Sequence, residues 1–150
     1  MISQTAEYAL RAIVYLADQQ TAPQTTQQIA EVTHVPAGYL AKVMQSLSRS
    51  GLVHAQRGLH GGFTLARPAT ELTVLDVVQA VDPLRRITSC PLGLKGHMSL
   101  CPLHRRLDNA VALVEDALRK STIAELLAEP GKRKGVVIPK PLCSAVEECD

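Results

Sequence analysis

A glycine-rich turn between two short extended segments is the feature that most limits how this chain can fold. Residues 52–56 and 62–66 have the composition of strands, and residues 57–61 (RGLHG) lie between them. Glycines in this turn and directly after it permit the positive backbone angles that a tight loop requires. The sequence therefore predicts a β-hairpin over residues 52–66, called the wing below.

Three stretches with helical periodicity precede the wing. Apolar side chains recur three and four positions apart in residues 3–19, the pattern of an amphipathic helix. Residues 25–35 form a second, shorter stretch with Thr25 or Thr26 as its N-cap. The third, residues 36–51, begins at a proline and ends at a glycine, as helices commonly do. The predicted fold class is therefore mainly α with a small β-hairpin wing, a winged helix-turn-helix followed by a long helix.

Residues 103–120 predict that long helix, and its apolar stripe lacks an obvious cover. Leu107, Val111, Val114 and Leu118 lie along one face. Little of the chain remains to cover a stripe of this length, so the expected partner is the same helix of a second subunit. The sequence thus predicts a homodimer.

These features divide the chain into four expected parts. Residues 1–82 would form the winged helix-turn-helix domain, including a short helix capped by Thr73. Residues 83–102 form an irregular segment that carries two cysteines, and loops of this length are usually functional or disordered. Residues 103–129 would hold the dimerisation helix and a short terminal helix, and residues 130–150 have the composition of a flexible tail.

Composition narrows the class of protein further. With 46% apolar but only 3% aromatic residues, the core must be built from aliphatic side chains, which favours helices. The chain has no run of 18 apolar residues, and its first 20 residues lack the hydrophobic block of a signal peptide. We expect a cytoplasmic protein without membrane contact. In that compartment the four cysteines favour metal binding, redox sensing or burial over structural disulfides.

The distribution of charge is more informative than the net charge of +2. No acidic residue lies between Glu31 and Glu71, a stretch that contains the basic residues Lys42, Arg49, Arg57 and Arg67. Such a segment can approach phosphates without repulsion, which favours a nucleic-acid partner. The alternative is a chance gap in a nearly neutral protein.

Four segments in this order resemble the family of winged-helix regulators that includes IscR, NsrR and CymR. They read SQTAEYALRAIVYLA, VPAGYLAKVMQSLSRSGLV, RGLHGGFTLA and LTVLDVVQAVD, and the resemblance covers residues 1–129. It implies a homodimeric transcription regulator that binds double-stranded DNA at a palindromic operator. Several members of that family sense iron–sulfur status, nitric oxide or redox state through a bound cluster.

The resemblance and the usual docking of a winged helix suggest which residues contact DNA. The N-terminal part of the third helix would enter the major groove, the wing would reach the minor groove, and the start of the second helix would meet phosphate. The candidates are Thr26, Gln27, Ala37, Gly38, Tyr39, Lys42, Arg57, His60 and Gly61. Alternatively, Tyr39 packs between helices and Thr26 only caps its helix.

The resemblance also points to a metal site in the cysteine-bearing loop. Cys90 and Cys101 match the outer two of three cysteines in the family, whereas the middle cysteine is missing and His97 lies near its place. His104 and Glu7 match residues that ligate a cluster in some relatives, Glu7 across the dimer interface. Two cysteines with one or two of these residues could hold an iron–sulfur cluster of the 2Fe–2S type, because histidine can replace cysteine at one iron.

Other chemistries remain open for the same loop. Cys90 and Cys101 could form a reversible disulfide or react singly, with Arg85, Arg86 and Lys95 nearby to lower the thiol pKa. Zinc is disfavoured because the chain has no Cys-x-x-Cys pair.

Two further classes of function compete with a DNA-binding regulator. A winged helix that binds only another protein is one, although the acid-free stretch counts against it. A small redox enzyme is the weakest, because no catalytic base stands at a recognisable spacing. Cys143 and Cys149, in the tail, have no assigned role.

Overall fold

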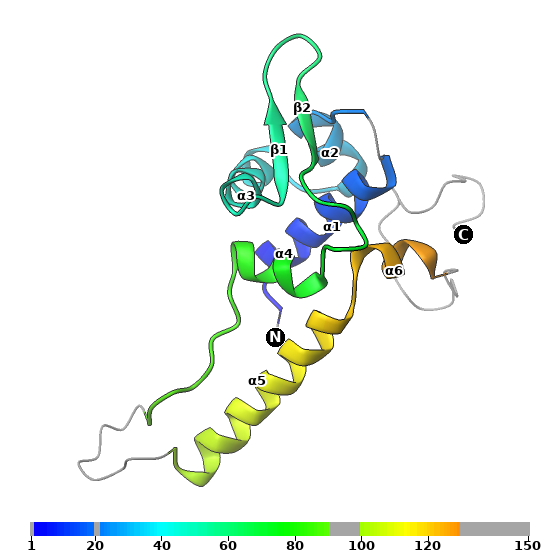
Figure 1. Cartoon of the computed structure of the whole chain (residues 1–150). Coiled ribbons are helices and arrows are strands. Elements are labelled where there is room, and N and C mark those ends of the chain that lie inside the picture. The colour runs from blue at the N-terminus through cyan, green and yellow to red at the C-terminus, as the bar shows by residue number, and fades with distance from the viewer. Residues whose placement is uncertain (1, 20–21, 91–99, 130–150) are drawn as a thin grey trace, which may run out of the picture.

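The computed structural model describes residues 2–19, 22–90 and 100–129. Its elements in chain order are α1 (Gln4–Gln19), α2 (Thr26–Thr33), α3 (Ala37–Arg49), β1 (Val53–Gln56), β2 (Gly62–Leu65), α4 (Val74–Val81), α5 (Pro102–Lys120) and α6 (Ile123–Ala128). Helices α1 to α4 and the hairpin gather into one body, and α5 extends away from it (Figure 1). The predicted fold class, mainly helical with a two-stranded wing, is confirmed.

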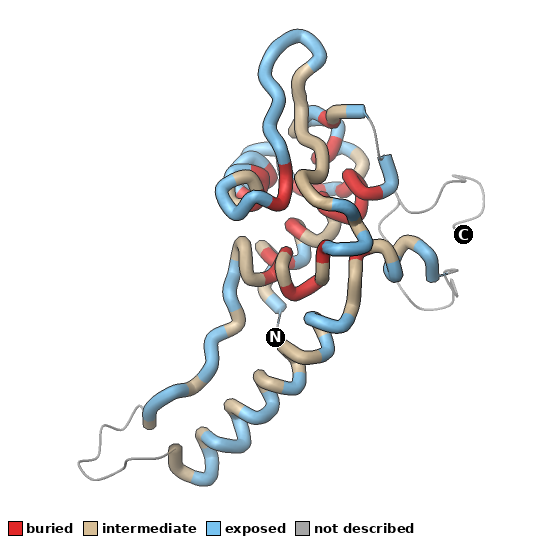
Figure 2. Tube along the Cα trace, in the orientation of Figure 1, coloured by how far each residue is buried: buried red, intermediate tan, exposed pale blue. Residues whose placement is uncertain are grey.

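An aliphatic core holds this body together. Helix α1 runs through its centre, where Ala9, Ala12 and Ile13 are fully buried. Helix α3 contributes Leu40 and Leu47, also without exposure to solvent. Burial is concentrated there, as the red segments of Figure 2 show. The apolar periodicity of both segments thus corresponds to the faces that pack against each other.

Local capping signals set the ends of several helices. Thr25, rather than Thr26, is the N-cap of α2 and forms a capping box with Gln28. Thr73 caps α4 in the same way, and Thr122 caps α6. Gly51, with a φ of 71°, follows the end of α3 in a conformation that favours glycine.

The wing is fixed to the body through Gln24, which lies just before the N-cap of α2. Its strands are antiparallel, with Val53 opposite Leu65. Gln24 forms two backbone hydrogen bonds with Phe63, of 2.8 and 3.0 Å, and its side chain accepts a bond from the buried Tyr15 hydroxyl. Gly62 permits this approach, because a Cβ there would lie 2.7 Å from the Gln24 backbone.

Helix α6 returns the chain to the body after α5. Ile123 is fully buried, and its backbone N–H donates to the Leu72 carbonyl at 2.8 Å. Val74 N–H donates to the Ser121 carbonyl at 2.9 Å, so the end of α5 is tied to the start of α4. The C-terminal end of α5 is therefore anchored, while its N-terminal end lies at a distance from the body (Figure 1).

Helix α5 buries none of its residues in this chain. Leu103 and Leu113 are 62% and 74% exposed, which is unusual for leucines on a helix with a marked apolar face. Among the described helices, none combines the length and the apolarity needed to cross a bilayer.

Candidate functional site

A basic surface is formed where α3 lies beside the wing. Lys42, Gln45 and Arg49 are exposed and spaced three and four residues apart, so they share one face of α3. Together with Ala55 and Phe63 of the hairpin they line a shallow groove. Sequence reasoning did not select Arg49 as a contact residue, although the exposed face of α3 includes it.

The N-terminal part of α3 is also open to solvent. Ala37 and Gly38 are exposed, and a Cβ at Gly38 would meet no atom within 4 Å. Tyr39 is 41% exposed, yet its hydroxyl forms a 2.5 Å hydrogen bond with Thr5. Its ring packs edge-on against Tyr8 at a centroid distance of 5.6 Å. Tyr39 therefore takes part in the packing of α1 on α3 and remains partly exposed.

The tip of the wing presents basic and apolar groups on a constrained backbone. Arg57 and His60 are exposed, and Leu59 is 96% exposed. A Cβ at Gly61 would lie 2.4 Å from the Gln56 carbonyl oxygen, so the turn excludes any larger residue there. The exposure of Leu59 was not anticipated, because leucine in a glycine-rich turn carries no pattern.

The remaining candidates for nucleic-acid contact lie nearby. Thr26 is half-buried at the start of α2, and Gln27 is exposed but donates to Glu31 at 3.0 Å. Arg67 pairs with Asp76 at 3.3 Å, which removes one cation from the acid-free stretch. Lys42 and Arg57 have no carboxylate within ion-pair distance in the described parts of the chain.

A second cluster lies at the N-terminal end of α5. Cys90, Cys101 and His104 each bring a ligand atom into a group whose members all lie within 4.8 Å of one another. The His104 Nδ1 atom is 3.1 Å from the Cys101 Sγ atom and 3.7 Å from the Cys90 Sγ atom. The structure thus brings together three of the five residues that sequence reasoning considered as ligands.

The pKa of the Cys101 thiol is lowered to about 7. The main cause is a hydrogen bond from the His104 backbone N–H, followed by the bond to the His104 side chain. Cys101 is the N-cap of α5, a position where free N–H groups stabilise a thiolate. The sequence analysis attributed a lowered thiol pKa to the basic residues of the loop, among them Arg85 and Arg86. In the structure, Arg86 forms ion pairs with Asp108 and Glu115 of α5.

Those carboxylates hold the segment that leads to Cys90. Asp108 accepts two hydrogen bonds from the Arg86 guanidinium, both of 2.7 Å, and a third of 2.9 Å from the Ile87 backbone N–H. Glu115 lies 3.7 Å from Arg86 on the same helix. These bonds lower the pKa of the Asp108 carboxyl to about 2, with the Arg86 side chain as the main cause.

The other two candidate ligands are not part of this cluster. Glu7 forms an ion pair with Arg11 within α1, and α1 lies in the body rather than at the far end of α5 (Figure 1). His97 and Lys95 lie outside the described residues, as do Cys143 and Cys149.

The three donors suit iron chemically. Two thiolates and an imidazole are ligands that iron accepts, and the Sγ and Nδ1 atoms of these half-buried residues lie within 4.8 Å of one another. A cluster of two irons takes four protein ligands. The described residues of one chain therefore fit three of these four positions.

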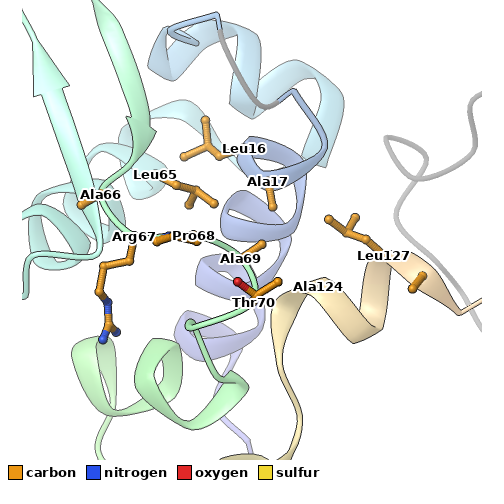
Figure 3. A pocket seen from close by; sticks show the side chains of 11 residues that line it. Leu16, Ala17, Leu65, Ala66, Arg67, Pro68, Ala69, Thr70, Ala124 and Leu127 are labelled. Atoms are coloured by element: carbon orange, nitrogen blue, oxygen red, sulfur yellow. The ribbon is translucent and has the colours of Figure 1, made fainter.

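A separate hollow of about 720 Å³ lies between the end of α1, residues 65–70 and α6. Figure 3 shows that Leu16, Leu65 and Leu127 contribute to its largely apolar lining. Its charged residue, Arg67, is paired with Asp76. This lining supplies neither a nucleophile nor a metal-ligand set.

The helix-turn-helix, the wing and the basic groove together define the class: a winged helix-turn-helix protein. Residues 2–129 match the model of the Rrf2 family, described as iron-dependent transcriptional regulators. The chain belongs to this family, and the resemblance inferred from its sequence is confirmed.

Known proteins of this kind are similar to the chain over most of its length. A protein of Aquifex aeolicus (strain VF5), named as an HTH-type transcriptional regulator, is 29% identical over 131 residues, 85% of this chain and 91% of the relative. The structure of CymR, the global cysteine regulator of B. subtilis, covers 84% of this chain and 95% of its own, with a TM-score of 0.70 and 23% identity. T. potens IscR has the same TM-score and identity and covers 85% of both chains.

The oxidised form of Staphylococcus aureus CymR is 25% identical, with a TM-score of 0.67 over 84% of this chain and 94% of its own. These likenesses and the family place the chain among DNA-binding transcription regulators and not among enzymes.

Proposed function

We propose that this regulator binds a palindromic operator as a homodimer and that the cluster of Cys90, Cys101 and His104 adjusts its affinity for DNA. The observation that carries the proposal is the convergence of these three side chains at the N-terminal end of α5. The group that they hold is an iron–sulfur cluster of the 2Fe–2S type. When bound, such a group supplies a centre that responds to oxidation, nitric oxide or loss of iron.

The DNA-binding role is assigned to one continuous surface. Ala37, Gly38, Tyr39 and Lys42 would face the major groove, in line with the docking of a recognition helix. Arg57, His60 and Gly61 would bring the wing to the minor groove, while Thr26 and Gln27 lie near phosphate. The absence of acidic residues between Glu31 and Glu71 supports this assignment, because phosphates meet no like charge there.

Dimerisation would take place along α5. Leu103, Leu107 and Leu113 are exposed in the single chain, whereas Leu118 at the C-terminal end of the helix packs against the core. Pairing with the same helix of a second subunit would bury them and would set two recognition helices at a fixed distance. The partner subunit would also bring its own first helix near the cluster, where Glu7 is the candidate for the fourth ligand, with His97 as the substitute.

The test is an anaerobic absorption spectrum combined with iron and sulfide analysis of freshly purified protein. We expect visible charge-transfer bands and about two irons and two sulfides per chain, the content of a 2Fe–2S cluster. The variants Cys90→Ala and Cys101→Ala should lose these bands. Protein that stays colourless and free of iron after reconstitution would contradict the cluster.

A thiol switch without a cluster is the second candidate, and one observation favours it. The pKa of Cys101 is lowered to about 7, so a large share of this thiol is ionised at neutral pH and can react. The Cys90 and Cys101 sulfurs lie close enough for a small rearrangement to join them. An oxidised form is known for S. aureus CymR, whose structure resembles this chain. Disulfide mapping after mild oxidation of the iron-free protein would test this candidate.

A further inference from the structure

We propose that Asp108 is the positioning residue of the sensor: it holds Arg86 and Ile87 on α5 so that Cys90 lies beside Cys101 and His104, and it links this site to α4. This inference rests on the proposed function and concerns how the site is assembled. Asp108 with its partners Arg86 and Ile87 is called the latch below.

The latch is stronger than an ordinary surface ion pair. Isolated exposed pairs contribute little, because both side chains lose freedom and solvent screens the charges. Asp108 instead forms a bidentate salt bridge with the Arg86 guanidinium and also accepts a hydrogen bond from the Ile87 backbone N–H. Its side chain is only 14% exposed. Glu115, about two turns further along α5, adds a second negative charge near Arg86.

Spacing along α5 connects the latch with the cysteines. His104 and Asp108 are four residues apart, so they lie on the same face of the helix, about 6 Å apart along its axis. Ile87 is bound at Asp108, and Cys90 lies beside His104. Residues 87–90 therefore run along α5 toward its N-terminal end, and Cys90 reaches the site from that direction.

The latch limits the space that is available to Cys90. Cys90 is three positions after Ile87, so its Cα atom stays within about 10 Å of the latch. Without the latch, the preceding residue that packs against the core is Leu84, six positions away, which allows a reach of about 20 Å. The connection to Cys101 still limits the search, but the effective concentration of Cys90 at Cys101 should fall markedly.

The same segment connects the site with the DNA-binding body. Residues 82–90 begin where α4 ends, and α4 packs against both α1 and α3. A change in the distance between Cys90 and Cys101 would displace the segment 82–90, which is bonded to Asp108 and is continuous with α4. The latch thus connects the sensor through α4 to α3, the recognition helix.

The disulfide equilibrium measures this positioning without any metal. In the iron-free chain carrying Cys143→Ser and Cys149→Ser, glutathione disulfide oxidises Cys90 and Cys101. The S–S bond of glutathione disulfide breaks, an S–S bond forms between Cys90 and Cys101, and the two thiol protons pass to the two glutathione molecules that are released. The measured quantity is the ratio [GSH]²/[GSSG] at which half of the chains are oxidised, read by mass spectrometry after thiol trapping.

We expect Asp108→Ala and Arg86→Ala each to lower this ratio about tenfold, the effect of losing charge-assisted hydrogen bonds. Asp108→Asn should have a smaller effect, because its amide oxygen still accepts from Ile87. Asp116→Ala is the matched control: Asp116 lies on the same helix and pairs with Lys120, away from the cysteines. An unchanged ratio in both Asp108→Ala and Arg86→Ala would overturn the proposal, and Arg86→Ala keeps the test valid if α5 is disturbed by a change at Asp108.

Operator binding separates this inference from the proposed function. The proposed function fails if the unaltered chain binds operator DNA equally with and without the disulfide, and equally with and without iron. In that case the ratio [GSH]²/[GSSG] still tests whether Asp108 positions Cys90. If the unaltered chain responds, Asp108→Ala should bind the operator but lose most of the difference between its oxidised and reduced forms. A full response in Asp108→Ala would contradict the link to α4.

Discussion

Cys101 combines three properties at one position. It is the N-cap of α5, it contacts the His104 ring at 3.1 Å, and its thiol pKa is lowered to about 7. Because the helix N-terminus stabilises the thiolate and not the neutral thiol, the lowered pKa reflects α5 itself. The reactivity of Cys101 should therefore depend on an intact first turn of α5.

A pH series tests this property of Cys101. In the reduced, iron-free protein, the rate of alkylation of Cys101 by iodoacetamide should rise through pH 7 and approach its plateau near pH 8, because the reactive thiolate forms as pH passes the lowered pKa. An ordinary cysteine has its midpoint at about pH 8.5. Peptide mass spectrometry distinguishes Cys101 from the other cysteines, and a midpoint above pH 8 would contradict the account.

In the proposed complex, Arg57 would contact the minor groove and Lys42 the major groove. We expect Arg57→Ala and Lys42→Ala each to weaken operator binding about tenfold and to reduce the salt dependence of binding by about one phosphate contact. Lys120→Ala, a change on α5 outside this surface, is the control with equal loss of charge. Fluorescence anisotropy at several salt concentrations measures both quantities, and equal affinities in all three variants would contradict the assigned surface.

Among the elements, α6 shows how a short helix can matter more than its length suggests. Its six residues cannot form a stable helix alone, but Ile123 enters the core and the backbone is bonded to Leu72 and Ala69. Helix α6 thereby anchors the C-terminal end of α5 to the body, so loss of this contact should affect the domain as a whole.

Substitution of Ile123 tests this anchoring. Ile123→Ala should lower the free energy of unfolding by about 3 kcal/mol, because it removes a fully buried side chain and leaves a cavity. Leu126→Ala in the same helix is the control, since Leu126 is 39% exposed and should cost far less. Denaturant unfolding followed by circular dichroism gives both values; equal losses would show that α6 is not docked as described.

The apolar face of α5 differs from that of α6, because only its C-terminal end, at Leu118, packs against the core of the same chain. Leu107→Glu, on this face and 47% exposed, should leave each subunit folded but shift the proposed dimer toward monomer. Leu59→Glu on the wing tip is the control, because it makes the same change at an exposed leucine away from α5. Sedimentation velocity measures the mass, and an unchanged dimer after Leu107→Glu would exclude this face of α5 from the interface.

At the scale of the whole molecule, the sequence predicted what depends on neighbouring residues. The caps at Thr73 and at Thr25, one of the two alternatives, the glycine after α3 and the wing are local signals, and all are confirmed. The convergence of Cys90, Cys101 and His104 was anticipated through the family resemblance, not through spacing.

Contacts between distant segments could not be predicted. Asp108 stands on a helix with several other charged residues, and nothing in the periodicity of α5 distinguishes it from Asp116. Its bond to Arg86 joins residues 22 positions apart and depends on the path of the chain between α4 and α5. The same applies to the hydrogen bond between Thr5 and Tyr39, which is set by the packing of α1 on α3.

The most direct test of the account measures operator affinity in defined states of the sensor. The DNA is a duplex containing the palindrome that the purified protein selects from a random library. The affinity for this duplex is measured for the reconstituted, the iron-free reduced and the oxidised protein. It is also measured for the double variant Cys90→Ala, Cys101→Ala. We predict that at least one change of state alters affinity about tenfold or more, as expected for coupled sites, and that the double variant shows no such change. Equal affinity in every state of the unaltered protein would contradict the claim that these cysteines regulate DNA binding.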